Sequence, residues 1–326
     1  MGLDPPAHPC GFRCSRWIGA ARIGYNLCVR LSRSLARRLA TLRIAGKKIR
    51  AAFHATAPAA LPAGAEELTR LSFPRLHADC VYWRIGTRGR YRLFWSDAGT
   101  FDLDARRGRV ACHLTPRASP ATVEEVLRGP VCSFFLVEQG FEPLHAGAVL
   151  VGGRCVAFAA APGAGKSSLI AYLVQNGAPF YADDILPFRR ARGAVRAWPG
   201  LPQLRLAPRS LRALRWRGRI LWSTRWKATL AVRPALRPVA ISAIYLLERR
   251  AGSRAVKLAT LSPGDAFAAL VSNTRNFAET AAHRLQTQLQ VCGWLANCVP
   301  VRRLTYPSGF ERLPEVRRAI LEDLAP

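Results

Sequence analysis

The chain has 326 residues, half of them hydrophobic, and its 49 lysine and arginine residues against 20 acidic ones give a formal net charge of +29. This length and composition allow one large or two modest globular domains. No apolar stretch approaches about 18 residues, which excludes a transmembrane helix. The nine cysteines follow no disulfide-like spacing and no secretion signal is evident, so we expect a cytoplasmic protein.

The positive charge is concentrated in two segments. Residues 1–60 hold eleven basic residues against one acidic residue, and residues 189–257 hold eighteen against Glu248 alone. The remainder is nearly neutral. The fold as a whole is therefore not uniformly basic, and the charge by itself does not favour a nucleic-acid-binding protein.

Residues 1–65 are expected to form a basic N-terminal extension that is disordered or partly helical. Regularly spaced leucines over 27–42 predict a basic amphipathic helix, which would suit an anionic membrane or RNA. A disordered extension, or translation from an upstream start codon, would explain the same composition. Cys10 and Cys14, with His8 nearby, form only a weak metal-binding pattern.

Residues 66–125 are expected to form a small β-rich module. Three β-rich runs separated by Gly and Asp turns predict its strands: Val81–Ile85, Arg90–Trp95 and Arg109–His113. Residues 120–140 then predict a helix or helix pair. This helical segment leads to a hairpin that begins at Leu144.

A glycine-rich loop of sequence APGAGKSS follows the apolar run Val156–Ala160. Its glycines let successive amides turn inward around a polyphosphate, and the helix after it directs its positive end at the same anion. The lysine would reach the phosphates and the first serine would ligate Mg²⁺. The predicted ATP-binding residues are Pro162, Gly163, Ala164, Gly165, Lys166, Ser167 and Ser168. Ala160 stands where the usual pattern has a glycine, and the alternative is a glycine-rich turn with a chance lysine.

An acidic pair follows the helix after the loop. The helix ends near Gly177, and Pro179–Ala182 predicts a short strand that ends in Asp183 and Asp184. Carboxylates placed beside a phosphate loop can hold Mg²⁺ and activate a hydroxyl nucleophile. Repulsion between neighbours would raise the pKa of one of them and suit it to be a base. A solvated turn is the alternative.

The order of these elements resembles the HPr kinase/phosphorylase family, bacterial P-loop kinases related to the ATP-dependent phosphoenolpyruvate carboxykinases. The matching residues are His145, the hairpin turn Val151–Arg154, Lys166–Ser167 and Ala182–Asp184. The resemblance implies an α/β fold in which a P-loop kinase core with a mixed sheet flanked by helices spans 126–326. It implies Asp183, Lys166 and His145 as catalytic residues, and Ser167 and Asp184 near the metal. Related kinases often form homo-oligomers. His145 would otherwise be a satisfied core residue.

One block of the regulatory enzyme is missing. Its E-x-R-G-x-G sequence after the acidic pair is replaced here by Trp198–Leu206, which puts the phosphorylase activity and HPr as substrate in doubt. The chain looks closer to divergent kinases of this family, some encoded with ribosomal-peptide biosynthesis genes. The resemblance therefore implies a protein or peptide acceptor, with a precursor peptide as one candidate.

The segment 211–227 alternates Arg with Trp. This pattern suits nucleic acid, an acidic protein or peptide substrate, or a solvated face whose Trp residues turn into the core, with nucleic acid the least favoured. The remaining predicted elements are a hairpin of Leu186–Phe188 with Ala194–Trp198, strands Leu204–Leu206, Ile241–Glu248, Val256–Leu261 and Val301–Tyr306, a helix capped by Ser262, and helices over 278–298 and 311–324.

These patterns predict an ATP- and Mg²⁺-dependent kinase that transfers the γ-phosphoryl group to a Ser or Thr hydroxyl of a protein or peptide. Two alternatives use the same loop. One is a small-molecule kinase or carboxykinase-like enzyme, and the other is a non-catalytic ATP-binding switch or RNA-binding module. The guanine-reading [NT]-K-x-D pattern is absent, which favours ATP over GTP.

Overall fold

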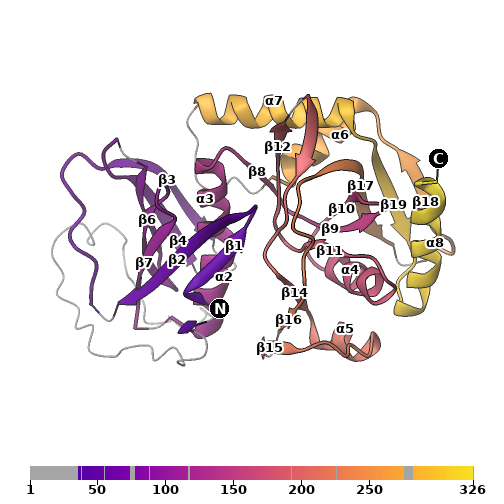
Figure 1. The fold of residues 1–326 in the computed structure, drawn as a ribbon, viewed down its shortest axis with the longest axis horizontal. Helices are drawn as coiled ribbons and strands as arrows, with labels where there is room; N and C mark the ends of the chain where they lie inside the picture. The colour runs from indigo at the N-terminus through magenta and orange to yellow at the C-terminus, as the bar shows by residue number, and fades with distance from the viewer. Residues whose placement is uncertain are drawn as a thin grey trace, which may run out of the picture.

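The computed structural model describes residues 36–325 except 38, 55, 74–77, 88, 117, 192, 225, 251 and 275–281, and the side chain of residue 283. Cys10, Cys14 and His8 lie outside the described residues, as do the leucines at 27, 31 and 35. The chain forms an N-terminal sheet with its helices and a larger C-terminal α/β part (Figure 1). Within the described residues, no helix is both long and apolar enough to cross a membrane.

The N-terminal sheet has seven strands, and β2 and β7 form its parallel pair. In spatial order the strands are β1 (Thr41–Ile44), β2 (Lys47–His54), β7 (Arg109–Leu114), β6 (Gly99–Asp104), β5 (Arg90–Trp95), β4 (Ala78–Arg84) and β3 (Glu66–Phe73).

Strands β1 and β2 lie within residues that the sequence placed in a basic extension, so the β-rich module begins near residue 41 and not at 66. Leu42, the last leucine of the amphipathic pattern, is a strand residue. Leu42, Ile44 and Ile49 are buried, while the basic side chains between them face outward. Buried and exposed residues alternate here with the two-residue period of a β-strand. The many arginine and lysine residues of the segment obscured this period in the sequence.

One continuous helical segment covers the N-terminal sheet. It consists of α2 (Pro120–Val126), a π-helical turn η3 (Leu127–Val131) that contains Pro130, and α3 (Cys132–Glu138). Its buried side chains share a hydrophobic core with those of the sheet: Val123, Leu127 and Phe135 pack with Tyr82, Leu93 and Phe101. The boundary expected at residue 125 or 126 therefore falls inside this helical segment. The chain passes to the C-terminal part near residue 140.

The C-terminal part is built on a nine-stranded mixed sheet. Its centre is the parallel trio β10 (Arg154–Ala160), β17 (Val239–Arg249) and β19 (Val301–Tyr306). The other strands pair antiparallel with their neighbours: β9 (Ala146–Val151), β11 (Phe180–Ala182), β18 (Lys257–Thr260), β13 (Ala194–Ala197), β12 (Leu186–Ala191) and β8 (Glu142–Leu144). The expected α/β class with a mixed sheet and flanking helices is confirmed.

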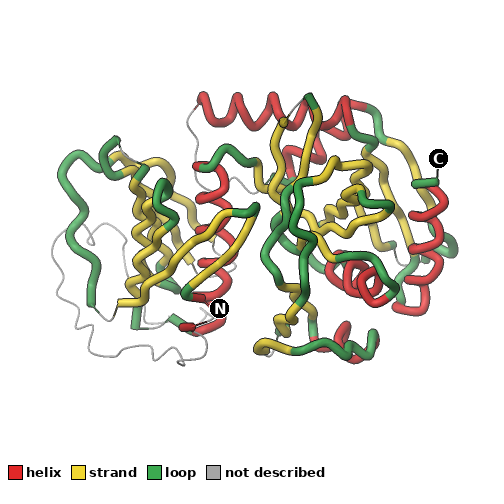
Figure 2. The backbone as a smooth tube through the Cα atoms, in the orientation of Figure 1, coloured by secondary structure: helices red, strands yellow, loops and turns green. Residues whose placement is uncertain are grey.

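Helices cover both faces of this sheet (Figure 2). Helix α4 (Lys166–Gln175) and helix α8 (Leu313–Asp323) pack on one face, and α6 (Pro263–Ser272) and α7 (Ala282–Cys298) pack on the other. Strand β10 supplies alternate residues to the two cores, with Phe158 on the α4 side and Ala157 on the α6 side. The predicted helix cap is present, because the Ser262 hydroxyl accepts from the Asp265 amide.

A small three-stranded sheet lies beside the main one (Figure 1). It contains β14 (Gln203–Leu206), β16 (Ala228–Ala231) and β15 (Ile220–Ser223), with the short helix α5 (Pro208–Ala213) between β14 and β15. Leu204 and Leu206 pack into the same core as α4. The Arg/Trp-rich segment thus forms α5, β15 and their connections, with Trp216 packed against that core and Trp226 exposed.

Candidate functional site

The glycine-rich loop joins β10 to α4. Gly163 and Gly165 have φ angles of 83° and 101°, in the left-handed region that favours glycine. The Tyr306 hydroxyl of β19 donates a 2.5 Å hydrogen bond to the Ala164 carbonyl, and a Cβ on Gly165 would lie 2.8 Å from that hydroxyl oxygen. The loop is therefore held against β19, with glycine required at the closest approach.

Lys166 is the first residue of α4 and is only 8% exposed. Its Nζ lies 3.7 Å from Oδ1 of Asp184. Burial of an ammonium group is costly unless opposite charge or polar groups surround it. Its place at a helix N-terminus, facing a carboxylate across a cleft, is therefore typical of a binding site for anionic groups.

Asp183 is the point at which three elements converge. It follows β11, is 5% exposed, and accepts a 3.0 Å hydrogen bond at Oδ1 from the Ser167 hydroxyl of α4. Its Oδ2 accepts a second 3.0 Å bond from the Arg205 backbone amide of β14. Two donors from separate elements thus fix the orientation of this carboxylate.

The pKa of Asp183 is raised to about 6. Burial is the main cause and repulsion by Asp184 adds to it, while Lys166, the Arg205 amide and the Ser167 hydroxyl act in the opposite direction. One of the two neighbouring carboxyl groups therefore has the raised pKa that the sequence predicted, although burial contributes more than their repulsion. Such a group is ionised at neutral pH and is still basic enough to accept a proton.

Asp184 adopts a φ of 64°, which turns the chain sharply after β11. Aspartate tolerates this left-handed conformation better than most residues do. Its carboxylate lies among three basic side chains: Lys166 Nζ at 3.7 Å, His145 Nε2 at 3.8 Å and Arg205 Nη1 at 4.0 Å. His145 is half-buried at the start of β9 and borders the cleft, so the alternative of a core histidine does not describe it.

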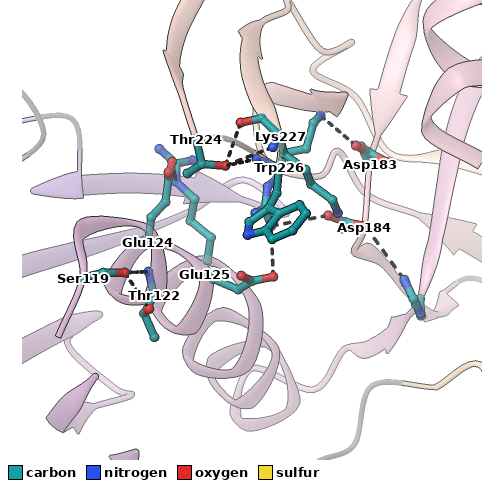
Figure 3. A network of polar contacts seen from close by, with 12 residues as sticks. Ser119, Thr122, Glu124, Glu125, Asp183, Asp184, Thr224, Trp226 and Lys227 are labelled. Atoms are coloured by element: carbon teal, nitrogen blue, oxygen red, sulfur yellow. Dashed lines mark hydrogen bonds and ion pairs between the residues drawn. The ribbon is translucent and has the colours of Figure 1, made fainter. Parts of the chain in front are cut away.

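Arg205 was not among the predicted catalytic, ATP-binding or metal-binding residues, although it begins the Arg-rich segment 205–227, near which the charge predicted the substrate to bind. Its Nη1 lies 3.6 Å from Oε1 of Glu125 and 4.0 Å from Oδ2 of Asp184, so one guanidinium faces acids from both parts of the molecule. Figure 3 shows Glu125 on its helix across from Asp183 and Asp184. In β14, buried leucines alternate with Gln203 and Arg205, which indicates that these two residues share one face of a strand. No local pattern indicates that this face lies beside Asp184.

A cleft of about 660 Å³ contains these groups, a volume within the usual range of ligand sites. The predicted residues Pro162, Gly163, Gly165, Lys166, Ser167, Ser168, Asp183, Asp184 and His145 all line it. Ala164 does not, since its carbonyl binds Tyr306. The unpredicted lining residues include Glu125, Arg128, Gln203, Arg205, Arg209, Lys227, Arg249, Tyr306 and Phe310.

The oxygen donors in the cleft fit Mg²⁺. Within the described residues, no three His, Cys, Asp or Glu side chains gather as a metal cluster. Mg²⁺ does not require one, because it is usually bound by one or two carboxylates together with substrate phosphates and water. The Ser167 hydroxyl and an Asp183 oxygen lie 3.0 Å apart and are hard donors of this kind. The predicted metal-binding residues are Ser167 and Asp184, and both line this cleft.

No model of a known protein family matches the sequence, and no curated protein does. Among solved structures, the chain shows a distant likeness to the HPr(Ser) kinase/phosphatase from Coxiella burnetii. The TM-score is 0.29 and the sequence identity 10%, over 56% of this chain and 92% of that chain.

Proposed function

We propose that the protein is a Mg²⁺- and ATP-dependent kinase whose acceptor is a Ser or Thr hydroxyl of a protein or peptide. The observation that carries this proposal is the hydrogen bond from Ser167, at the N-terminus of α4, to the buried carboxylate of Asp183. It joins a predicted phosphate-binding element directly to a side chain suited to general-base catalysis.

The loop and α4 would bind the triphosphate. Backbone amides at the start of α4 and the helix dipole favour an anion there, and the glycines at 163 and 165 leave the backbone accessible. Lys166 stabilises the negative charge on the transferred group. The Ser167 hydroxyl and a carboxylate of the acidic pair would hold Mg²⁺, which when bound neutralises charge on the phosphate oxygens.

Asp183 would act as the base. The acceptor oxygen forms a bond to the γ-phosphorus while the bond from phosphorus to the β–γ bridging oxygen breaks, and that electron pair leaves with ADP. The hydroxyl proton passes to Asp183, whose pKa of about 6 leaves it ionised at neutral pH. Asp184 would hold Lys166, His145 and Arg205 around the transferred group through its contacts with all three.

The test is phosphoryl transfer from γ-labelled ATP to synthetic peptides that contain a single serine, with wild type, Asp183→Asn and Lys166→Ala. Glu322→Gln, an exposed substitution on α8 remote from the cleft, is the matched control. We expect labelled peptide with wild type and the control, and a large loss with the other two variants. Nucleotide binding without transfer of label to any acceptor would contradict the kinase and favour an ATP-dependent switch.

A further inference from the structure

Asp184 lies between two groups of cleft-lining residues, because it faces Lys166 at 3.7 Å and Arg205 of β14 at 4.0 Å, and we call the part of the cleft beside each group an end. One end is lined by the glycine-rich loop with Tyr306 and Phe310, where the proposed function places ATP. The other end lies between the helical segment α2–η3 and strand β14, and is lined by Glu125, Arg128, Gln203 and Arg205. The proposed function leaves this second end for the acceptor.

Gln203 is a buried polar residue at the second end. Leu204 and Leu206 of β14 face the core with α4, so Gln203 and Arg205 face the opposite way, along the cleft wall. Gln203 is 5% exposed, and no group in the described part of the chain hydrogen-bonds its Oε1. A buried polar atom without a partner is unfavourable, so a ligand that supplied the missing hydrogen bond would bind there favourably.

The chemistry of this side chain fits a peptide. A primary amide has an acceptor oxygen and a donor nitrogen side by side, so it can pair with the N–H and the C=O of an extended chain. A small hydroxylic molecule offers no such repeating donor and acceptor.

The charges at this end favour an acidic peptide. Arg205 of β14 and Lys227, which directly precedes β16, both line the cleft, and the acids nearest to Arg205 are Glu125 at 3.6 Å and Asp184 at 4.0 Å. The Thr224 hydroxyl accepts hydrogen bonds from the amide of Lys227 at 2.9 Å and from that of Trp226 at 3.1 Å. The Trp226 side chain is 69% exposed and, in Figure 3, projects over the space between Glu125 and Asp184.

We infer that this end of the cleft binds an extended acceptor peptide with an acidic residue close to the phosphorylated hydroxyl. Gln203 contacts the peptide main chain, Lys227 and Arg205 attract the acidic side chain, and Trp226 covers the segment from the solvent side. The inference rests on the proposed function, since it names the substrate class of the same site. It places recognition on β14, Trp226 and Lys227, away from the ATP-binding loop.

The experiment measures phosphorylation of nine-residue synthetic peptides with one serine flanked by Asp, by Asn or by Lys. Gln203→Leu removes the amide at similar volume, and Lys227→Glu reverses one charge. Gln175→Leu is the control, because that side chain contacts the Leu214 carbonyl on the outer surface. The KM for peptide and the KM for ATP are determined for each protein.

We expect wild type and the control to prefer the Asp-flanked peptide. Gln203→Leu is expected to raise the KM for this peptide roughly fivefold to tenfold, with a smaller change in the KM for ATP. Lys227→Glu is expected to shift the preference toward the Lys-flanked peptide. Efficient transfer with unchanged peptide KM in both variants would overturn the inference.

Two further outcomes separate the inference from the proposed function. Transfer of the γ-phosphoryl group to water or to a small alcohol, with no peptide labelled, would contradict the peptide acceptor and leave phosphoryl transfer intact. Absence of any γ-phosphate release by wild type would contradict the proposed kinase, and the peptide site with it.

Discussion

The Ser167 hydroxyl donates a 3.0 Å hydrogen bond to Oδ1 of Asp183. This bond connects the first turn of α4 to the residue that follows β11, so it restrains the proposed phosphate-binding element and the proposed base relative to each other. Asp183 is also bonded to the Arg205 amide, which ties β14 to the same carboxylate. Positioning of this kind supplies much of the rate in phosphoryl transfer, where the protein contributes little covalent chemistry.

The transfer rate is expected to fall as the pH drops through about 6, because the base must be ionised and that is the pKa of Asp183. Ser167→Ala removes a hydrogen bond that lowers this pKa, so the acidic limb of the pH–rate profile moves to higher pH and the maximal rate falls. Ser272→Ala is the control, since that exposed hydroxyl donates to the Ala269 carbonyl at 2.9 Å within α6, outside the cleft. Matching pH profiles for the two variants would contradict this role.

The raised pKa of Asp183 also predicts a pH-dependent stability. In the folded state the pKa is about 6 against a usual value of 3.8, so between these values the folded protein binds a proton that the unfolded chain releases. The group therefore destabilises the fold at neutral pH, and this destabilisation is relieved as the pH falls through 6 toward 4. Relative to Asp183→Asn, wild type should gain on the order of 1–2 kcal/mol in free energy of unfolding between pH 7 and pH 5.

Chemical denaturation of wild type and Asp183→Asn across pH 5–8 measures this difference. Both proteins share every other titrating group, so subtraction of the two curves isolates Asp183. If the difference in free energy of unfolding stayed constant with pH, the Asp183 carboxyl group would not have a raised pKa in the folded protein. The same would follow if acidification lowered the stability of wild type relative to Asp183→Asn.

The contact between Gly165 and Tyr306 predicts a rescue by a second substitution. Gly165→Ala places a Cβ 2.8 Å from the Tyr306 hydroxyl oxygen and imposes strain at a φ of 101°. We expect a loss of ATP affinity and about 1–3 kcal/mol of stability. Tyr306→Phe removes the hydroxyl, so the double variant should recover the steric part of that loss but not the backbone strain.

Gly163→Ala is the matched control for this pair. Gly163 has a φ of 83°, but a Cβ there would meet nothing within 4 Å. Its substitution should show backbone strain alone and no improvement when Tyr306→Phe is added. Thermal unfolding and titration with a fluorescent ATP analogue report both effects, and equal rescue of the two glycine variants would rule out the steric explanation.

Arg205 is expected to matter for activity well beyond its contact with Glu125. Arg205→Gln removes a cation that faces Asp184, whereas Glu125→Gln removes a partner whose side chain is 64% exposed. A double-mutant cycle on stability should give a coupling of only about 0–1 kcal/mol, as usual for exposed ion pairs. The rate of transfer should fall far more for Arg205→Gln than for Glu125→Gln, and equal losses would contradict a role beside Asp184.

Much of the C-terminal part could be predicted from sequence because its signals are local. The strand Val301–Tyr306 matches β19, and the helix expected over 311–324 matches α8 closely. The hairpin before the loop is also present, with Gly152 and Gly153 at positive φ between β9 and β10. In each case the apolar period and the turn residues agree with the tertiary fold.

What the sequence did not predict depends on contacts between distant segments. The sequence of strand β6 (Gly99–Asp104) has alternating Asp residues and is typical of a turn. In the structure, Asp102 forms a 2.6 Å salt bridge with Arg92 of β5. Arg205 and Glu125 are 80 positions apart and meet only because β14 lies against α2. Such placements follow from packing between elements, which periodicity cannot report.

The helical segment α2–η3 has one side in the core of the N-terminal sheet and presents Glu125 and Arg128 to the cleft on another. Under the proposed function, the N-terminal part would therefore contribute one wall of the acceptor site, while the loop and the helix that would hold ATP belong to the C-terminal part. Substitutions at the cleft-facing positions of α2–η3 would then change the choice of acceptor more than the affinity for ATP. The two properties could evolve at different rates within one chain.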